Sequence, residues 1–185
     1  MDFKIVDKNL ETSFQEIRRR IWRLQSGGTI DSLKTIGANT TGQIGASFVS
    51  LKQLANKYTP DESLALLLWN TRQREEQIVA CLLLPKETNK EKITQLFPDC
   101  LNFEIAEYFG SLYLQSHPQL LELSADWLHS ENPYQTVAAL TALAKYLILN
   151  KNACAKQKKL FDSALQREFK DKYVQLLANR YRLNT

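Results

Sequence analysis

Short, regularly spaced helix signals divide the middle of the chain, and they constrain its fold more than any other feature. The segment Thr59-Pro60-Asp61-Glu62 offers an N-cap, a first-turn proline and an acidic third helical position. Comparable starts recur at Thr88 with Glu91, at Ser116 with Pro118 and at Asn132-Pro133. We predict helix pairs that open at intervals of about thirty residues, in the lower range for helical repeats, near Pro60, Thr88, Ser116 and Asn150.

The rest of the sequence also predicts an all-α protein. Leu, Ala, Gln and Lys dominate, and the six glycines and five prolines are too few for the frequent turns of an all-β fold. Phe14, Ile17, Ile21 and Leu24 recur at helical spacing, which predicts a buried stripe on a helix over residues 9–25. The length suits one domain, residues 1–185. Periodicity alone leaves two architectures open, a solenoid of stacked helix pairs and a compact helical bundle.

Charge is distributed unevenly along the chain. Residues 1–59 carry nine Lys/Arg and five Asp/Glu, residues 60–144 carry five and twelve, and residues 145–185 carry ten and three. Basic ends therefore flank an acidic middle. Because of this alternation, the net charge of +4 does not by itself indicate a nucleic-acid-binding surface.

Residues that could hold a metal or a cofactor are sparse. Cys81, Cys100 and Cys154 form no CxxC pair, and His117 and His129 lie too far apart to share a metal. No glycine-rich phosphate loop or GxSxG motif is present. Because there is also no signal peptide and no run of about 20 apolar residues, we expect a cytoplasmic monomer with reduced thiols and with neither metal nor cofactor.

Several segments resemble one family of helical-repeat proteins. The stretch Gly45–Tyr58, GASFVSLKQLANKY, is similar to an early motif of that family. Leu64–Trp69 followed by Arg74–Ala80 resembles its helix ending in Leu-Trp, its charged turn and its next aliphatic helix. The helices around Arg18–Gly28 and Phe103–Tyr108 are also similar. Over residues 17–145 the chain thus resembles the AlkD-like, HEAT-like-repeat DNA alkylation-repair family, which implies stacked antiparallel helix pairs.

The resemblance also implies a function. Active members are DNA glycosylases that hold duplex DNA on a basic helical surface and release N3- or N7-alkylated purines without flipping the base. The positive charge of the lesion already weakens the glycosidic bond. The protein needs to hold the DNA backbone, surround the sugar with aromatic rings and place a carboxylate beside the developing oxocarbenium ion, because fixed charge at a developing charge stabilises the transition state.

The family's catalytic residues are carried over by position. Its Trp and the Asp four residues later fall on Phe103 and Glu107, so the resemblance implies Glu107 as the stabilising carboxylate. Phe103 and Tyr134 would line the sugar cage. The family's arginine falls on Thr136 or Val137, and its late tryptophan has no counterpart after Trp127. We therefore expect a DNA-binding member with weak or no glycosylase activity.

Two basic clusters are candidates for contacts with the DNA backbone. Arg19, Arg20 and Arg23 lie on the first helix, and Lys156, Lys159 and Lys170 lie in the last forty residues or so.

Other interpretations stay open. Phe103 and Tyr108 could pack in the core while Glu104 and Glu107 form a solvated face. The chain could also be a non-catalytic scaffold that binds other proteins, because stacked helix pairs present extended surfaces. All three tryptophans, Trp22, Trp69 and Trp127, are predicted to be core residues.

Overall fold

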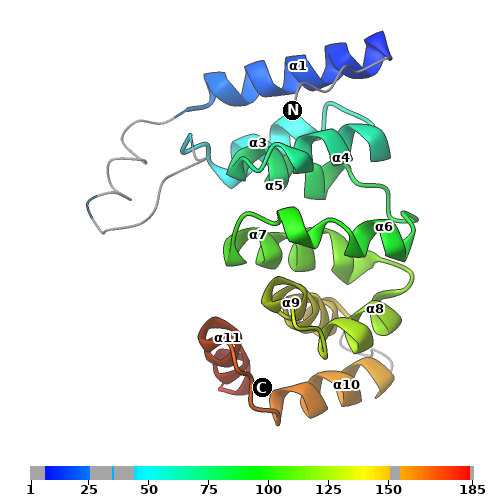
Figure 1. Cartoon of the computed structure of the whole chain (residues 1–185), viewed down its shortest axis with the longest axis vertical. Coiled ribbons are helices and arrows are strands. Elements are labelled where there is room, and N and C mark those ends of the chain that lie inside the picture. Colours follow the sequence, from blue (N-terminus) through cyan, green and yellow to red (C-terminus); the bar gives the residue numbers. More distant parts are fainter. Residues whose placement is uncertain (1–6, 26–34, 36–43, 151–154, 184–185) are drawn as a thin grey trace. The chain divides into compact units, whose positions relative to one another are not determined.

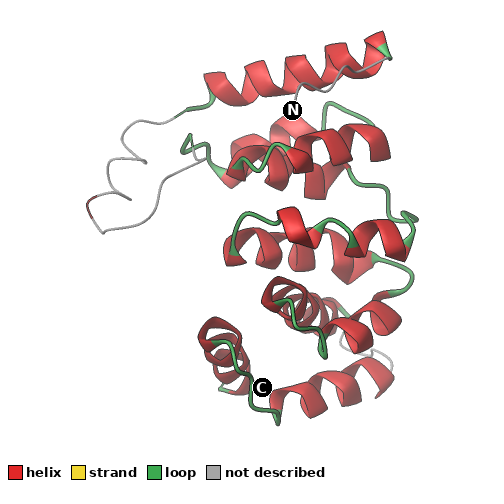
Figure 2. Ribbon diagram, in the orientation of Figure 1, coloured by secondary structure: helices red, strands yellow, loops and turns green. Residues whose placement is uncertain are grey.

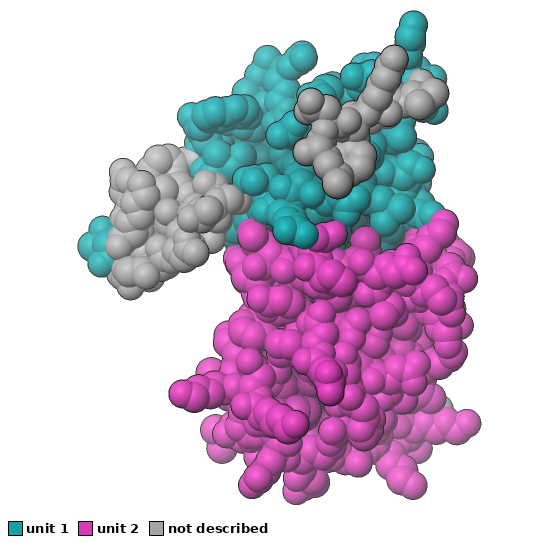
Figure 3. All heavy atoms as spheres, in the orientation of Figure 1, with its two compact units in different colours: residues 1–85 teal, residues 86–185 magenta. Residues whose placement is uncertain are grey.

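The computed structural model describes residues 7–25, 35, 44–150 and 155–183. These residues form helices and the turns between them, with no strand among them (Figure 2). The chain is therefore all-α, as its composition and helix signals predict. It divides into two compact units, residues 1–85 and 86–185, which Figure 3 draws in two colours.

Unit 1 contains four described helices, α1 (Lys8–Arg23), α3 (Phe48–Ala55), α4 (Glu62–Asn70) and α5 (Arg74–Leu83) (Figure 1). The helices α4 and α5 form a pair joined by a short turn, in which Arg72 has a left-handed φ of 53°. Helix α1 packs on α3, α4 and α5 through the fully buried Ile17 and Ile21. The predicted apolar stripe of the first helix is thus confirmed at these two positions.

Two adjacent glutamates of α5 connect the parts of unit 1. The Glu75 Oε1 atom accepts hydrogen bonds from the backbone N–H groups of Ile44 and Gly45, at 3.1 and 2.9 Å. Arg18 of α1 donates from Nε to Glu76 Oε1 at 3.0 Å. Both glutamates are buried, where an unpaired carboxylate is costly, whereas the Arg18 side chain that reaches Glu76 is half-exposed.

Unit 2 is built around α9. Its α-helices are α6 (Lys90–Thr94), α7 (Phe103–Tyr108), α8 (Leu120–Trp127), α9 (Pro133–Leu149), α10 (Ala155–Leu165) and α11 (Lys172–Arg182). A 3₁₀ turn at Phe97–Asp99, a π-helical turn at Phe109–Tyr113 and a 3₁₀ turn at Leu114–Ser116 complete it. Every residue of α9 from Gln135 to Ala144 is buried, because α7, α8, α10 and α11 all contact this helix.

Gly110 allows the closest approach inside unit 2. It lies in the π-helical turn that follows α7. A Cβ atom at this position would lie 2.4 Å from the Ala138 carbonyl oxygen and 3.0 Å from Thr141 Cβ, both on α9. Glycine is therefore required where the α7 segment crosses α9, and this crossing fixes the two helices that carry Phe103 and Tyr134.

Several predicted helix starts are displaced by one to three residues. Asp61, not Thr59, caps α4, and its side chain accepts from the Leu64 N–H at 2.7 Å. Asn89, not Thr88, caps α6, and α8 begins at Leu120 although Ser116 was predicted as its cap. The last helix begins at Lys172, and Asp171 caps it. The start at Asn132-Pro133 is confirmed.

The tryptophans and cysteines divide between core and surface. Trp69 and Trp127 are buried, as predicted, whereas the prediction for Trp22 is wrong, because its residue is 62% exposed. Trp22 directly follows Ile21, but it lies outside the buried face that Ile17 and Ile21 form on α1. Cys81 and Cys100 are buried free thiols, and burial raises the pKa of Cys100 to about 12. Cys154 lies outside the described residues.

Candidate active site

The first turn of α7 presents an aromatic ring and a carboxylate on one side of unit 2. Asn102 caps the helix, since its side-chain oxygen accepts from the Ile105 N–H at 3.0 Å. Ile105 and Ala106 are buried against the unit, whereas Phe103 and Glu107 are only half-buried. Phe103 and Glu107 are four residues apart and share a helix face, so a ligand could reach both side chains at once.

Three aromatic rings meet at this position, although they come from three different helices. The Phe103 ring meets the Tyr134 ring of α9 edge to face, with centroids 4.9 Å apart and an interplanar angle of 62°. It also stacks on Tyr173 of α11, with centroids 4.3 Å apart and an angle of only 3°. Such offset or edge contacts are favourable for aromatic pairs. The structure thus brings the predicted residues Phe103 and Tyr134 together, and adds a third ring.

The Glu107 carboxylate lies beside these rings and contacts α11 through both of its oxygens. The Tyr173 hydroxyl donates a 2.6 Å hydrogen bond to Oε1. An Nη atom of Arg180 lies 3.6 Å from Oε2, which forms an ion pair at the half-exposed surface. Burial and the bond to Glu107 raise the pKa of Tyr173 to about 12, so the phenol remains a donor at neutral pH. The carboxylate is therefore held in one orientation without being sequestered in the core.

Comparison with known proteins bears on what this arrangement is for. A family profile described as DNA alkylation repair enzyme matches residues 17–170, most of the chain. The chain belongs to this family. A search of curated proteins and a search of solved structures both give no match. The match includes all of α7, α9 and α10, while Tyr173 and Arg180 lie beyond its end.

This member of the DNA alkylation repair family has no cation where the family's arginine was expected. Thr136 is buried, and its hydroxyl donates to the Trp127 carbonyl oxygen at 3.0 Å. Val137 is fully buried. The cation that contacts Glu107 is Arg180, from α11. Likewise, Tyr173 supplies a late aromatic ring although no tryptophan follows Trp127.

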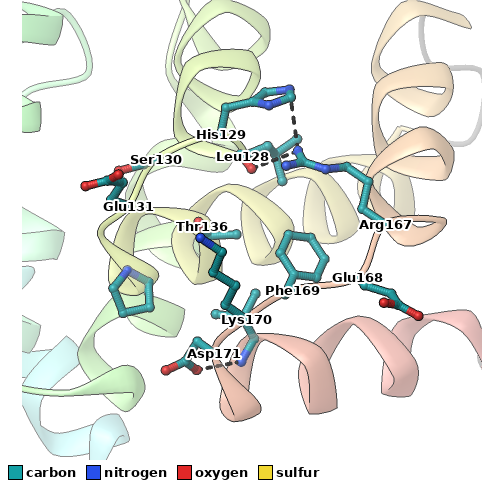
Figure 4. A pocket seen from close by; sticks show the side chains of 12 residues that line it. Leu128, His129, Ser130, Glu131, Thr136, Arg167, Glu168, Phe169, Lys170 and Asp171 are labelled. Carbon is teal, nitrogen blue, oxygen red and sulfur yellow. Dashed lines mark hydrogen bonds between the residues drawn. The ribbon is translucent and has the colours of Figure 1, made fainter.

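A cavity of about 670 Å³ lies in unit 2 between the turn that precedes α9 and the turn that precedes α11 (Figure 4). Arg167 crosses it, donating from Nη1 to the Leu128 carbonyl oxygen at 2.9 Å and lying 3.4 Å from His129 Nε2. Lys170, one of the predicted DNA-binding residues, lines the same cavity. Three acidic residues also line it, Glu131, Glu168 and Asp171, so its charge is mixed.

The other predicted DNA-contacting residues lie on helix surfaces. Lys156 and Lys159 are exposed on α10 of unit 2. In unit 1, Arg19 and Arg23 are exposed on α1, while Arg20 forms an ion pair with Glu16 at 2.5 Å. Lys156 and Lys159 are therefore available to a phosphate backbone, as are Arg19 and Arg23, whereas Arg20 is already partnered.

Tyr173 and Arg180 are the site residues that sequence reasoning missed. The resemblance implies a late tryptophan and not a tyrosine, and Tyr173 lies 66 residues from Glu107 along the chain. The one local signal is an aromatic residue in the first turn of a helix that Asp171 caps. Nothing in the spacing indicates that this turn contacts α7.

The described part of the chain offers no alternative centre for metal chemistry. Within it, no group of three or more His, Cys, Asp or Glu residues is placed to hold a metal ion. The two histidines that the sequence offered have different surroundings, since His117 is buried and His129 is exposed. None of the described helices is long and apolar enough to cross a membrane.

Proposed function

We propose that this protein binds duplex DNA through its backbone and that Phe103, Glu107, Tyr134 and Tyr173 form a site for the release of cationic alkylated purines. One observation carries the proposal, namely the contact of the Glu107 carboxylate with a cluster of three aromatic rings in a member of the DNA alkylation repair family. The site requires neither a metal nor a cofactor, because the leaving purine is already positively charged.

The arrangement suits this chemistry for electrostatic reasons. Loss of an alkylated purine leaves positive charge on the sugar, and a carboxylate fixed nearby stabilises that charge more than it stabilises the ground state. The bond from Tyr173 to Glu107 limits the motion of the carboxylate. The faces of aromatic rings carry partial negative charge, so rings around the sugar would favour the same transition state.

Arg180 links binding of the DNA backbone to the ion pairing of the Glu107 carboxylate. In the free protein it pairs with the Glu107 carboxylate at 3.6 Å, and its side chain is more than half exposed. Exposed ion pairs are weak, so a DNA phosphate can compete for the guanidinium. Transfer of Arg180 to a phosphate would leave Glu107 with its full negative charge toward the sugar.

The catalytic part of the proposal is tested by measuring release of 7-methylguanine from methylated duplex DNA. We expect the wild type to release the base above the spontaneous rate and Glu107→Gln to lose about tenfold or more of that excess. Glu104→Gln is the matched control, because it removes a carboxylate from the same helix three residues away. Release by the wild type at the spontaneous rate alone would show that the protein is not a glycosylase.

The binding part of the proposal is tested by salt. Affinity for random duplex DNA should fall steeply between about 50 and 200 mM salt, because each bound phosphate releases counterions. Replacement of both Lys156 and Lys159 by Gln should weaken binding at every sequence and reduce the salt slope. Absence of binding at low salt would exclude a DNA-binding function.

A second candidate is a scaffold that binds another protein. It is favoured by exposed apolar side chains on the last turn of α9 and on α11, namely Ile148, Leu149 and Leu176. Where exposed apolar side chains form a patch, the patch often marks a protein-binding surface. If DNA binding fails, these three residues are the ones to mutate in a search for partner proteins.

A further inference from the structure

The C-terminal half of α1 combines an exposed indole with an unusual density of positive charge. Residues 17–23, IRRRIWR, contain four arginines and no acidic residue. Ile17 and Ile21 are fully buried in unit 1 and fix the orientation of the helix, while the Trp22 residue is 62% exposed. By contrast, Trp69 is 1% exposed and Trp127 is 3% exposed. The chain thus leaves one of its three tryptophans in water.

The arginines around Trp22 are not equivalent. Arg18 pairs with Glu76 and Arg20 pairs with Glu16, so these two are held within unit 1. Arg19 and Arg23 are exposed. The bond from Arg20 and, to a smaller extent, the charge of Arg19 lower the pKa of the Glu16 carboxyl, so Arg19 has an acidic neighbour that is already bonded to Arg20. Arg19 and Arg23 lie four residues apart on the side of the helix turned away from the buried stripe, and Trp22 lies three residues after Arg19 and next to Arg23.

We propose that Trp22, Arg19 and Arg23 bind an unpaired stretch of DNA, with the indole stacked on a base and the two guanidinium groups on phosphates. The proposal takes its ligand class from the DNA binding proposed above and adds a residue and a DNA form to it. Charge complementarity selects a polyanion, since residues 17–23 carry four arginines and the adjacent Glu16 is already paired with Arg20. The flat, exposed indole then favours a polyanion with exposed rings, because every nucleic-acid base has a flat face that can stack on an aromatic side chain.

Single-stranded DNA fits this surface better than a duplex or an acidic peptide. In a duplex the bases already stack on one another, so the Trp22 indole could stack on a base only at a duplex end or at a gap. An acidic peptide could pair with Arg19 and Arg23, but it offers no regular array of flat faces to Trp22. We therefore infer that α1 contacts DNA at strand ends, gaps or distorted sites where bases are unpaired.

Intrinsic fluorescence tests the stacking directly, because Trp22 is the one tryptophan at the surface. Single-stranded oligothymidylate of about 12 nucleotides is titrated into the full chain at low salt. We expect quenching of the emission, and tighter binding than to a blunt-ended duplex of equal length. Trp22→Ala should lose the quenching and weaken single-strand binding about tenfold, whereas Trp22→Phe, which keeps a ring, should retain most of the affinity.

Matched variants separate this effect from a general loss of structure. Val49→Ala removes another exposed apolar side chain from unit 1 and should leave the affinity unchanged. Arg19→Gln with Arg23→Gln should reduce the salt slope of single-strand binding by about two. Because Arg19, Trp22 and Arg23 are all exposed, these variants should unfold in urea at the same midpoint as the wild type.

Three results would overturn the inference. The first is binding of oligothymidylate with no change in emission, and the second is equal affinity of the wild type and Trp22→Ala. The third is stronger quenching by poly-glutamate than by oligothymidylate, which would assign the surface to an acidic protein. If duplex binding and purine release persist in any of these cases, only this inference fails. If no form of DNA binds, the proposed function fails with it.

Discussion

Glutamates on short helices play opposite roles in the two units. In unit 1, Glu75 is fully buried and accepts two backbone N–H groups, and its neighbour Glu76 receives Arg18. In unit 2, Glu107 is half-buried, and both of its partners, Tyr173 and Arg180, come from one helix, α11. Glu75 and Glu76 thus join the elements of unit 1. Glu107, by contrast, remains accessible to a ligand.

Glu75 and Glu107 differ in whether water or a ligand can take over their hydrogen bonds. Water cannot reach Glu75, so loss of the side chain leaves the N–H groups of Ile44 and Gly45 without an acceptor. Water or a ligand can reach Glu107 and its partners, so their contacts can be exchanged at little cost. We therefore expect mutation of Glu75 to lower the stability of unit 1 and mutation of Glu107 to affect activity with little effect on stability.

The largest expected effect comes from Glu75→Ala, which tests this comparison most severely. Removing one partner of a buried charge network typically costs about 3–5 kcal/mol, so the urea midpoint of unit 1 should fall sharply. Glu107→Ala should change the free energy of unfolding by no more than about 1 kcal/mol. Equilibrium unfolding followed by circular dichroism measures both. The exposed Glu11→Ala is the control for α1, and equal losses for Glu75→Ala and Glu107→Ala would break the comparison.

Gly110→Ala probes the scaffold beneath the candidate site and ranks second. The added methyl group would lie 2.4 Å from the Ala138 carbonyl oxygen, so α7 and α9 must separate. Overpacking of this kind costs about 1–3 kcal/mol. Because α7 carries Phe103 and α9 carries Tyr134, purine release should fall together with stability.

Ser111→Ala is the matched control for Gly110→Ala, because it changes the adjacent, half-buried residue of the same turn. It should leave both the free energy of unfolding and purine release near their wild-type values. Unchanged stability in Gly110→Ala would show that the crossing of α7 and α9 can relax without cost.

The elements of both units were largely predictable from the sequence, whereas the contacts of the site were only partly so. Periodic apolar residues such as Ile17 and Ile21 are local signals, and so is the start at Asn132-Pro133. Helix starts were displaced where two polar residues competed for one cap, as at Thr59 and Asp61. Phe103 and Glu107 were implied by the resemblance, because they occupy the positions of the family's Trp and of the Asp four residues later. Tyr173 was missed, because stacking between α7 and α11 depends on packing through α9 that no local pattern encodes.

The smallest expected effect is on the pH dependence of stability, which titration of Tyr173 controls. This titration reports directly on the contact between Tyr173 and Glu107. The folded pKa, about 12, exceeds the ordinary value of 10.0, so the folded state holds this proton more tightly than the unfolded state. The stabilisation is therefore complete below pH 10 and is lost as the pH rises toward 12. The stability difference between the wild type and Tyr173→Phe should be about 1 kcal/mol at neutral pH and should shrink above pH 10.

Tyrosinate absorbance measures the same proton, and Glu107→Gln should bring the titration of Tyr173 to lower pH, because the carboxylate no longer opposes ionisation. A Tyr173 titration that does not respond to Glu107→Gln would mean that burial alone sets its pKa, and the carboxylate would then be free to move independently of the rings.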